Sequence, residues 1–202
     1  MKIRMFKTVV ACGLVVLGFN STARAQAFTE NFDDITTLPG SGWFQQNNSV
    51  PSGALPVWFQ GNSAEVFPAY NGGPNAYIAC NFSSTTGGNG TISNWLVTPN
   101  RIFRNGDVIT FYTRKNNVGA DHPERMEVRL STNGASTNVG TTATGLGDFT
   151  TLLLSINPAL FAGVYPREWT QFTRSAASTA TDRTGVATVP WRRHCPRARR
   201  IF

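Results

Sequence analysis

The chain has 202 residues, of which 41% are hydrophobic and 14% charged, and its formal net charge is +7. The positive charge lies at the two ends, since between residues 26 and 169 seven basic residues face ten acidic ones. A phosphate-binding surface needs clustered cations, so this distribution excludes a nucleic-acid partner for the central region. The cysteines Cys12, Cys80 and Cys195 are too few and too scattered to form a disulfide framework.

The first 25 residues are typical of a secretory signal peptide. Three basic residues precede an apolar segment at positions 8–19, and Ala23-Arg24-Ala25 supplies a small-x-small cleavage site. This apolar segment is shorter than the roughly 20 residues that a membrane-spanning helix needs. The sequence therefore predicts a mature chain that starts at Gln26, has no membrane span after signal removal, and is secreted or held at the cell surface.

Residues 26–173 are predicted to form one all-β domain. Short apolar segments alternate with turns rich in Gly and Asn, such as Asn71-Gly72-Gly73-Pro74 and Asn133-Gly134, which suit tight connections. This pattern is typical of an antiparallel sandwich or barrel. The predicted strands are, in chain order, residues 64–68, 76–82, 92–98, 107–114, 125–131, 149–156 and 168–173.

The strand predicted at residues 125–131 shows the clearest alternation. Met126, Val128 and Leu130 share one face, and charged side chains at positions 125, 127 and 129 share the other. Strict alternation indicates a half-buried strand. We therefore expect the apolar face to pack inward and the charged face to meet solvent.

Residues 174–202 differ from everything before them. They hold seven Arg and one acid, end in an Arg/Pro-rich stretch, and show almost no apolar alternation. Two interpretations remain open for this basic tail: a disordered extension that belongs to the protein, or an out-of-frame sequence that follows a coding accident after Phe172.

Six short segments of the domain form a recognisable set when taken together and in order, although no one of them is specific alone. They are residues 30–34 (ENFDD), 38–43 (LPGSGW), 93–99 (SNWLVTP), 106–112 (GDVITFY), 125–132 (RMEVRLST) and 169–172 (WTQF). As a set they resemble the choice-of-anchor J domains, which are bacterial surface or secreted modules related to the cleaved-adhesin domains of cell-surface proteases.

The resemblance implies a jelly-roll-like β-sandwich that acts outside the cell as a non-enzymatic binding or adhesion module. Its partner would be an extracellular glycan, a matrix component or a surface protein. Such domains usually continue with two more strands after the segment at residues 169–172, and the basic tail stands in their place. We therefore expect the closing C-terminal strands to be missing, which favours the coding accident.

Three acidic residues near the start of the domain are candidate calcium ligands. Calcium takes six to eight oxygen ligands, and Glu30, Asp33 and Asp34 supply carboxylates within five residues. In related domains, the resemblance implies, a first-strand acid shares such a site with an acid of the last strand, which this chain lacks. The alternative is a solvated acidic strand end, and no other cofactor is predicted.

Trp43, Trp58, Phe59 and Tyr70 are candidate glycan contacts. They fall in a segment rich in Gly, Pro and Asn, where aromatic rings could stack on sugars and nearby amides such as Gln60 could bind hydroxyl groups. The alternative is that the rings fold inward, because large aromatic side chains usually bury their area in a core.

The sequence gives little support to catalysis. His122 is the one histidine between residues 26 and 173, in a segment predicted to be a loop, and no G-x-S-x-G motif is present. Zinc would need several His or Cys ligands. The leading interpretation is therefore a non-enzyme, and the alternative is a secreted carbohydrate-active enzyme or its sugar-binding accessory domain, since ten acids permit some carboxylate pair.

Overall fold

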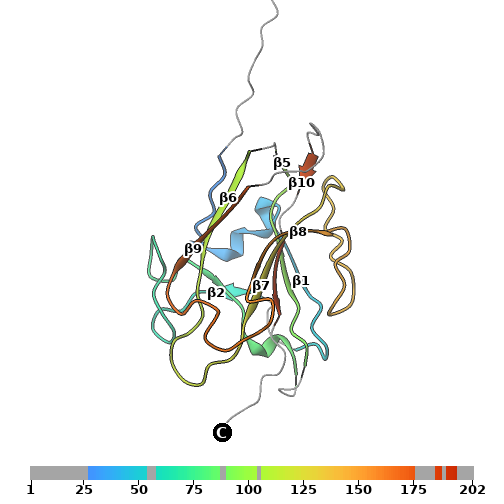
Figure 1. The fold of residues 1–202 in the computed structure, drawn as a ribbon. Helices are drawn as coiled ribbons and strands as arrows, with labels where there is room; N and C mark the ends of the chain where they lie inside the picture. Colours follow the sequence, from blue (N-terminus) through green and yellow to red (C-terminus); the bar gives the residue numbers. More distant parts are fainter. Residues whose placement is uncertain are drawn as a thin grey trace, which may run out of the picture.

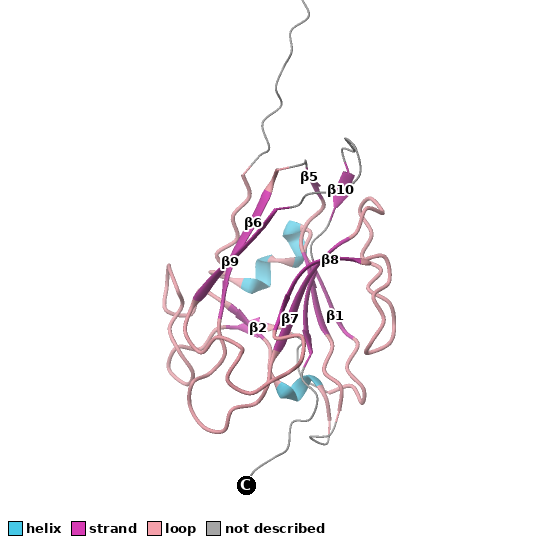
Figure 2. Ribbon diagram, in the orientation of Figure 1, coloured by secondary structure: helices cyan, strands magenta, loops and turns pink. Residues whose placement is uncertain are grey.

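The computed structural model describes residues 27–53, 58–86, 90–103, 106–175, 185–187 and 190–194. Within these residues the regular structure is almost entirely β-strand, and every strand pairs antiparallel (Figure 2). The helical elements of the described part are the 3-10 turns η1 (Ile35–Thr37), η2 (Pro39–Ser41) and η3 (Phe82–Ser84). The predicted all-β antiparallel class is confirmed, while the signal segment lies outside the described residues.

The strands of the described residues fall into one large sheet and three two-stranded ladders. The large sheet has the order β1-β4-β11-β7-β8, and the ladders are β10-β5, β2-β3 and β6-β9. Their bounds are β1 Phe44–Asn47, β2 Phe59–Gln60, β3 Ile78–Ala79, β4 Asn94–Val97, β5 Arg101–Phe103, β6 Val108–Thr113, β7 Arg125–Leu130, β8 Thr151–Ile156, β9 Thr170–Ser175, β10 Gly185–Ala187 and β11 Pro190–His194.

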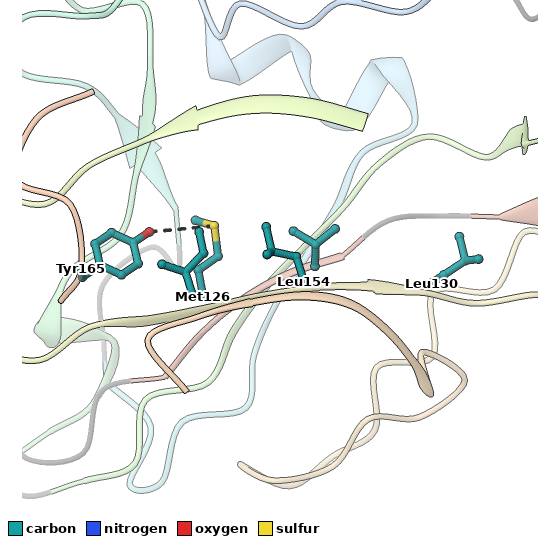
Figure 3. Packing of buried hydrophobic residues seen from close by; sticks show 6 residues of the cluster. Met126, Leu130, Leu154 and Tyr165 are labelled. Atoms are coloured by element: carbon teal, nitrogen blue, oxygen red, sulfur yellow. Dashed lines mark hydrogen bonds between the residues drawn. The ribbon is translucent and has the colours of Figure 1, made fainter. Parts of the chain in front are cut away.

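The β6–β9 ladder faces the β7–β8 part of the large sheet (Figure 1). Between them lies a buried cluster that contains Met126, Val128, Leu130 and Tyr165 (Figure 3). Phe111 and Phe172, which stand opposite each other in the β6–β9 ladder, pack against this cluster and stack at 5.7 Å between ring centroids. The apolar alternation of β6 and β7 thus builds the interior of a β-sandwich.

A second cluster fills the same side of the sheet next to β4. Leu96 of β4 meets Leu38, Trp43, Trp58 and Cys80, all less than a tenth exposed. The indole Nε1 of Trp58 donates a hydrogen bond of 3.0 Å to the main-chain oxygen of Trp95. The contacts of Leu38 and Trp43 with Leu96 fix the N-terminal segment and its 3-10 turns to the sheet.

The outer face of the sheet is covered by the loop of residues 131–149, and this corrects one expectation. Glu127 and Arg129 of β7 are only 4% and 9% exposed, whereas the sequence predicted that they would meet solvent. The loop places the buried Phe149 against Trp95. The main-chain oxygens of Phe149 and of the following Thr150 accept from Arg129 Nη1. Alternation assigned the faces of β7 correctly, but it could not show that the loop after β7 folds back over the second face.

Residues beyond position 173 contribute strand backbone to the fold. β9 continues through Ser175, β10 pairs with β5, and β11 pairs with both β4 and β7. The large sheet is therefore continuous between β4 and β7, where the sequence led us to expect missing closing strands. Main-chain pairing needs no particular side chains, which is why the composition of the basic tail did not predict it. Whether that segment is in frame stays a prediction.

Smaller differences concern short strands. The predicted strand at residues 64–68 does not form, since a turn covers residues 63–66 and residues 67–68 are irregular. Only Ile78–Ala79 of the predicted strand at 76–82 pairs as a strand. Short pairs such as β2–β3 depend on a partner that lies far along the chain, so local composition gives little signal for them.

Candidate functional site

A cavity of about 2090 Å³ opens between the N-terminal segment, the β2–β3 region, β6 and the loop that follows β6. Small-molecule pockets usually hold about 300–1,000 Å³, so a single small ligand would leave much of this volume unfilled. Its lining is mixed, and includes the rings of Phe28, Phe67 and Tyr112 together with Glu65 and Asn71. The size and chemistry suit an extended amphipathic ligand.

Two stacked tyrosines form an exposed aromatic part of this lining. Tyr70, in the loop after β2, is 54% exposed, and its ring lies 3.7 Å from that of Tyr112 on β6, with an interplanar angle of 17°. The side-chain hydrogen bond between the two tyrosines raises the pKa of the Tyr112 hydroxyl above its ordinary value. Both rings are thus held in one orientation and carry hydroxyl groups beside an apolar face.

An aromatic cluster around Arg114 holds this region in place. The guanidinium carbon of Arg114 lies 4.3 Å from the ring centroid of Phe67, and Phe67 in turn stacks on Tyr77 at 5.0 Å. Trp169 meets both rings edge-on, and its Nε1 donates to the main-chain oxygen of Pro68 at 2.9 Å. These contacts tie residues 67 and 68 to β6 and to the start of β9, and thereby position Tyr70.

The four predicted glycan contacts all line the cavity, but they differ in exposure. Trp43 and Trp58 are 7% and 5% exposed and belong to the core cluster around Leu96, so for them the packing alternative describes the structure. Phe59 is half-buried in β2, and Tyr70 is exposed. The nearby amide of Gln60 donates to the main-chain oxygens of Phe32 and Asn75, so it connects chain segments.

The sequence did not single out Tyr112, Phe67, Arg114 or Trp169 as members of one site. These residues come from three separate segments, and only the tertiary fold brings them to Tyr70. The alternation of β6 places Tyr112 on the face opposite Phe111, and this signal could have identified it.

The three predicted calcium ligands each lie in the N-terminal segment but do not form a ligand set. Glu30 Oε1 accepts the main-chain N–H of Phe32 at 2.8 Å. Asp34 Oδ1 accepts from Thr36 at the start of η1, and these hydrogen bonds lower the pKa of Asp34. Asp33 is exposed. In the part of the chain that the structure describes, no group of three or more His, Cys, Asp or Glu side chains could hold a metal. The calcium site stays a prediction.

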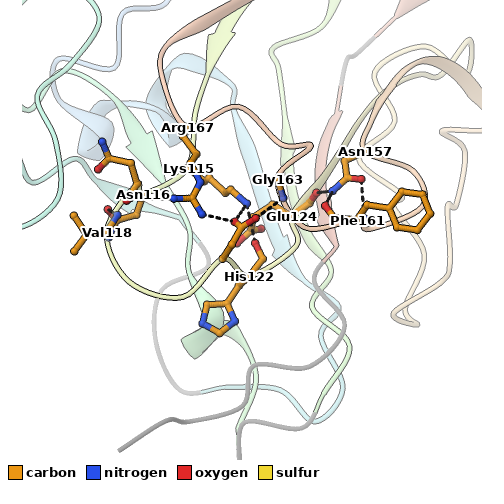
Figure 4. A network of polar contacts seen from close by, with 11 residues as sticks. Lys115, Asn116, Val118, His122, Glu124, Asn157, Phe161, Gly163 and Arg167 are labelled. Carbon is orange, nitrogen blue, oxygen red and sulfur yellow. Dashed lines mark hydrogen bonds and ion pairs between the residues drawn. The ribbon is translucent and has the colours of Figure 1, made fainter.

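A polar network around Asp121 joins the loop after β6 to the loop after β8 (Figure 4). The Asp121 carboxylate accepts from Lys115 Nζ and from the main-chain N–H of Gly163, and it pairs with Arg167 at 3.2 Å. Lys115 Nζ also donates to the main-chain oxygen of His122 at 3.1 Å. His122 therefore lies in a connecting loop, as predicted, whose backbone is fixed by a buried lysine.

The Asp121 network predicts a pH-dependent contribution to stability. The hydrogen bond from Lys115 lowers the pKa of Asp121 below its ordinary 3.8. A lowered folded-state pKa stabilises the fold above the ordinary value, and this contribution is lost as the pH falls through the folded-state pKa. Asp121→Asn should therefore be less stable than wild type at pH 7, and the difference in unfolding free energy should shrink as the pH falls below about 4. Urea unfolding at a series of pH values measures it, and a constant difference would contradict the assignment.

No helix in the described residues has the length and apolar character to cross a membrane.

Comparisons with known proteins give no family. No family model matches the chain, and no curated protein matches it. Among solved structures it is similar to the K1 cleaved adhesin domain of Lys-gingipain from Porphyromonas gingivalis W83, with 22% identity, a TM-score of 0.46, and coverage of 78% of this chain and 88% of that one. For the K3 cleaved adhesin domain of the same protein the identity is 16%, the TM-score 0.32, and the coverage 75% and 95%.

Proposed function

We propose that this chain is an exported, non-enzymatic module that binds an extracellular glycan, either free or carried by a matrix or surface protein. The observation that carries the proposal is the exposed Tyr70 ring, stacked on Tyr112 in the lining of a large cavity. Export is proposed from the signal-like segment at residues 1–25, which lies outside the described residues.

The chemistry around the two tyrosines supports a glycan. A sugar ring presents apolar C–H groups on its faces and hydroxyl groups at its edge, so it suits an aromatic surface with polar neighbours. The same cavity has the amides of Asn71 and Asn116 and the carboxylate of Glu65 in its lining. Its volume fits several sugar units better than one.

The test is binding of the mature chain, from Gln26 onward, to a glycan array, followed by calorimetry with the best ligand. Tyr70→Ala should weaken binding by about tenfold or more, because aromatic residues at the centre of a site commonly contribute more than 1 kcal/mol. Tyr70→Phe keeps the ring and should retain most of the affinity. Phe161→Ala is the matched control, since Phe161 is 66% exposed and lies outside the cavity lining.

Equal affinity of Tyr70→Ala and wild type for every ligand would contradict the proposed site. Release of shortened products from a bound glycan would favour the carbohydrate-active enzyme.

A further inference from the structure

The strand β11 fills a place in the large sheet that we call the β4–β7 slot, bounded by Asn94–Val97 on one side and Arg125–Val128 on the other. Position 191 stands opposite Leu96 in β4 and Val128 in β7, so one short strand pairs with both neighbours at once. The slot therefore accepts five residues of extended backbone, antiparallel to both of its walls.

The walls of the slot cannot be left unpaired without a large cost. All four residues of β4 are buried, and Met126, Glu127 and Val128 of β7 are buried too. Without a strand between them, the sheet would separate into the ladders β1–β4 and β7–β8, each with a free edge along buried residues. Buried main-chain groups need hydrogen-bond partners, and open edges capture other strands.

The strand that fills the slot, β11, follows both walls of the slot, β4 and β7, in the chain. β4 and β7, together with β1 and β8, precede β11 in the chain, and the connection from β9 to β10 spans residues 176–184. Among the described strands, β10 and β11 pair with β5, β4 and β7 and not with β9. The β10 and β11 strands of a second chain could therefore make the same strand pairs.

The C-terminal residues 176–202 carry a net charge opposite to that of residues 27–175, and this favours contact between the two parts. Residues 27–175 contain ten acids and eight bases, a net charge of −2, whereas residues 176–202 contain one acid and six arginines, a net charge of +5. Opposite net charges promote encounter between the two parts. The register also places position 192 opposite Glu127.

We propose that two copies of this chain exchange the strands β10 and β11, so that β11 of each copy fills the β4–β7 slot of the other. The exchange is reciprocal and produces a closed two-fold dimer, which is a low-cost arrangement because each contact replaces an identical one. The dimer forms when copies are concentrated enough for a second chain to reach the slot before the chain's own segment does.

Disulfide trapping in the mature chain tests the exchange. Arg125 of β7 stands opposite His194 of β11. Cα atoms of directly opposed antiparallel residues lie about 4.5–5.5 Å apart, which is within the range that a disulfide spans. In a background with Cys80→Ala and Cys195→Ser, one preparation carries Arg125→Cys and a second, isotope-labelled preparation carries His194→Cys. The two are mixed, unfolded, refolded over a range of concentrations, oxidised, and analysed by mass spectrometry.

The expected product is a disulfide-linked pair of one labelled and one unlabelled chain, whose yield rises several-fold with concentration. The control replaces His194→Cys by Thr173→Cys on β9, which pairs with β6 and is not adjacent to β7 in the sheet. It should give several-fold less linked product.

Two results would overturn the proposal. The first is a combination of two observations: the mixed preparations give no more linked product than the control, and a single chain with both Arg125→Cys and His194→Cys forms its internal disulfide at every concentration. In that case β11 stays with its own chain. The second is rapid hydrogen exchange of the β4 and β7 main-chain amides in the concentrated, folded protein, because the slot would then be empty.

Discussion

Phe149→Ala should lower the free energy of unfolding by about 3–5 kcal/mol, the usual loss for a fully buried phenylalanine. Phe149 is 0% exposed, and its ring centroid lies 5.8 Å from that of Trp95, which is also fully buried. Its removal leaves a void between the sheet and the loop of residues 131–149. Because domains of this size are stable by only about 5–15 kcal/mol, urea unfolding should show a large fall in the midpoint.

The matched control for Phe149 is Leu152→Ala. Leu152 lies three residues further along, on β8, but is 48% exposed, so its loss should be about 1 kcal/mol or less. If both substitutions lowered the midpoint equally, the loop of residues 131–149 would not be packed on the sheet as described.

Glu127→Gln is expected to be comparably damaging, for an electrostatic reason. The Glu127 carboxylate pairs with Arg125 on one oxygen and accepts from Arg129 Nε at 2.7 Å on the other, and Glu127 and Arg129 are both less than a tenth exposed. The substitution leaves the buried Arg129 guanidinium without its counter-charge, which typically costs about 3–5 kcal/mol. Urea unfolding at neutral pH measures this loss.

A double variant separates the loss of a partner from the value of the ion pair itself. Glu127→Leu combined with Arg129→Met removes both buried charges, and such replacements are often neutral or stabilising. The double variant should therefore be more stable than Glu127→Gln alone. A double variant that is less stable than the single one would show that the Arg129 bonds to the loop matter more than the charge balance.

The two substitutions concern the same structural feature, the cover over the outer face of the large sheet. This cover buries both faces of β7 from Met126 to Leu130 and adds a layer over part of the sheet. Tyr70 and Tyr112 lie away from this cover, because the alternation of β6 places Tyr112 on the face of the β6–β9 ladder opposite the interior Phe111. The molecule therefore has one sheet face closed by its own loop, and a partly exposed tyrosine pair on the other ladder.

The candidate site was only partly predictable. Tyr70 was identified as a candidate because it falls in a segment rich in Gly, Pro and Asn, and it is exposed. Trp43 and Trp58 stand in similar local sequence yet are buried, because the strand β4 passes beside them. Whether a ring in a loop faces solvent depends on what packs against it from elsewhere in the chain.

The sequence by itself determined the all-β class, the positions of β4, β6, β7, β8 and β9, and which side chains of β7 share a face. These features follow from the period of two along a strand and from the local demands of turns, both of which act between near neighbours. The tertiary structure alone decided that the charged face of β7 is buried, that Tyr112 joins Tyr70, and that a basic segment pairs between β4 and β7. Each of these depends on contacts between distant residues, where main-chain hydrogen bonding and burial outweigh local composition.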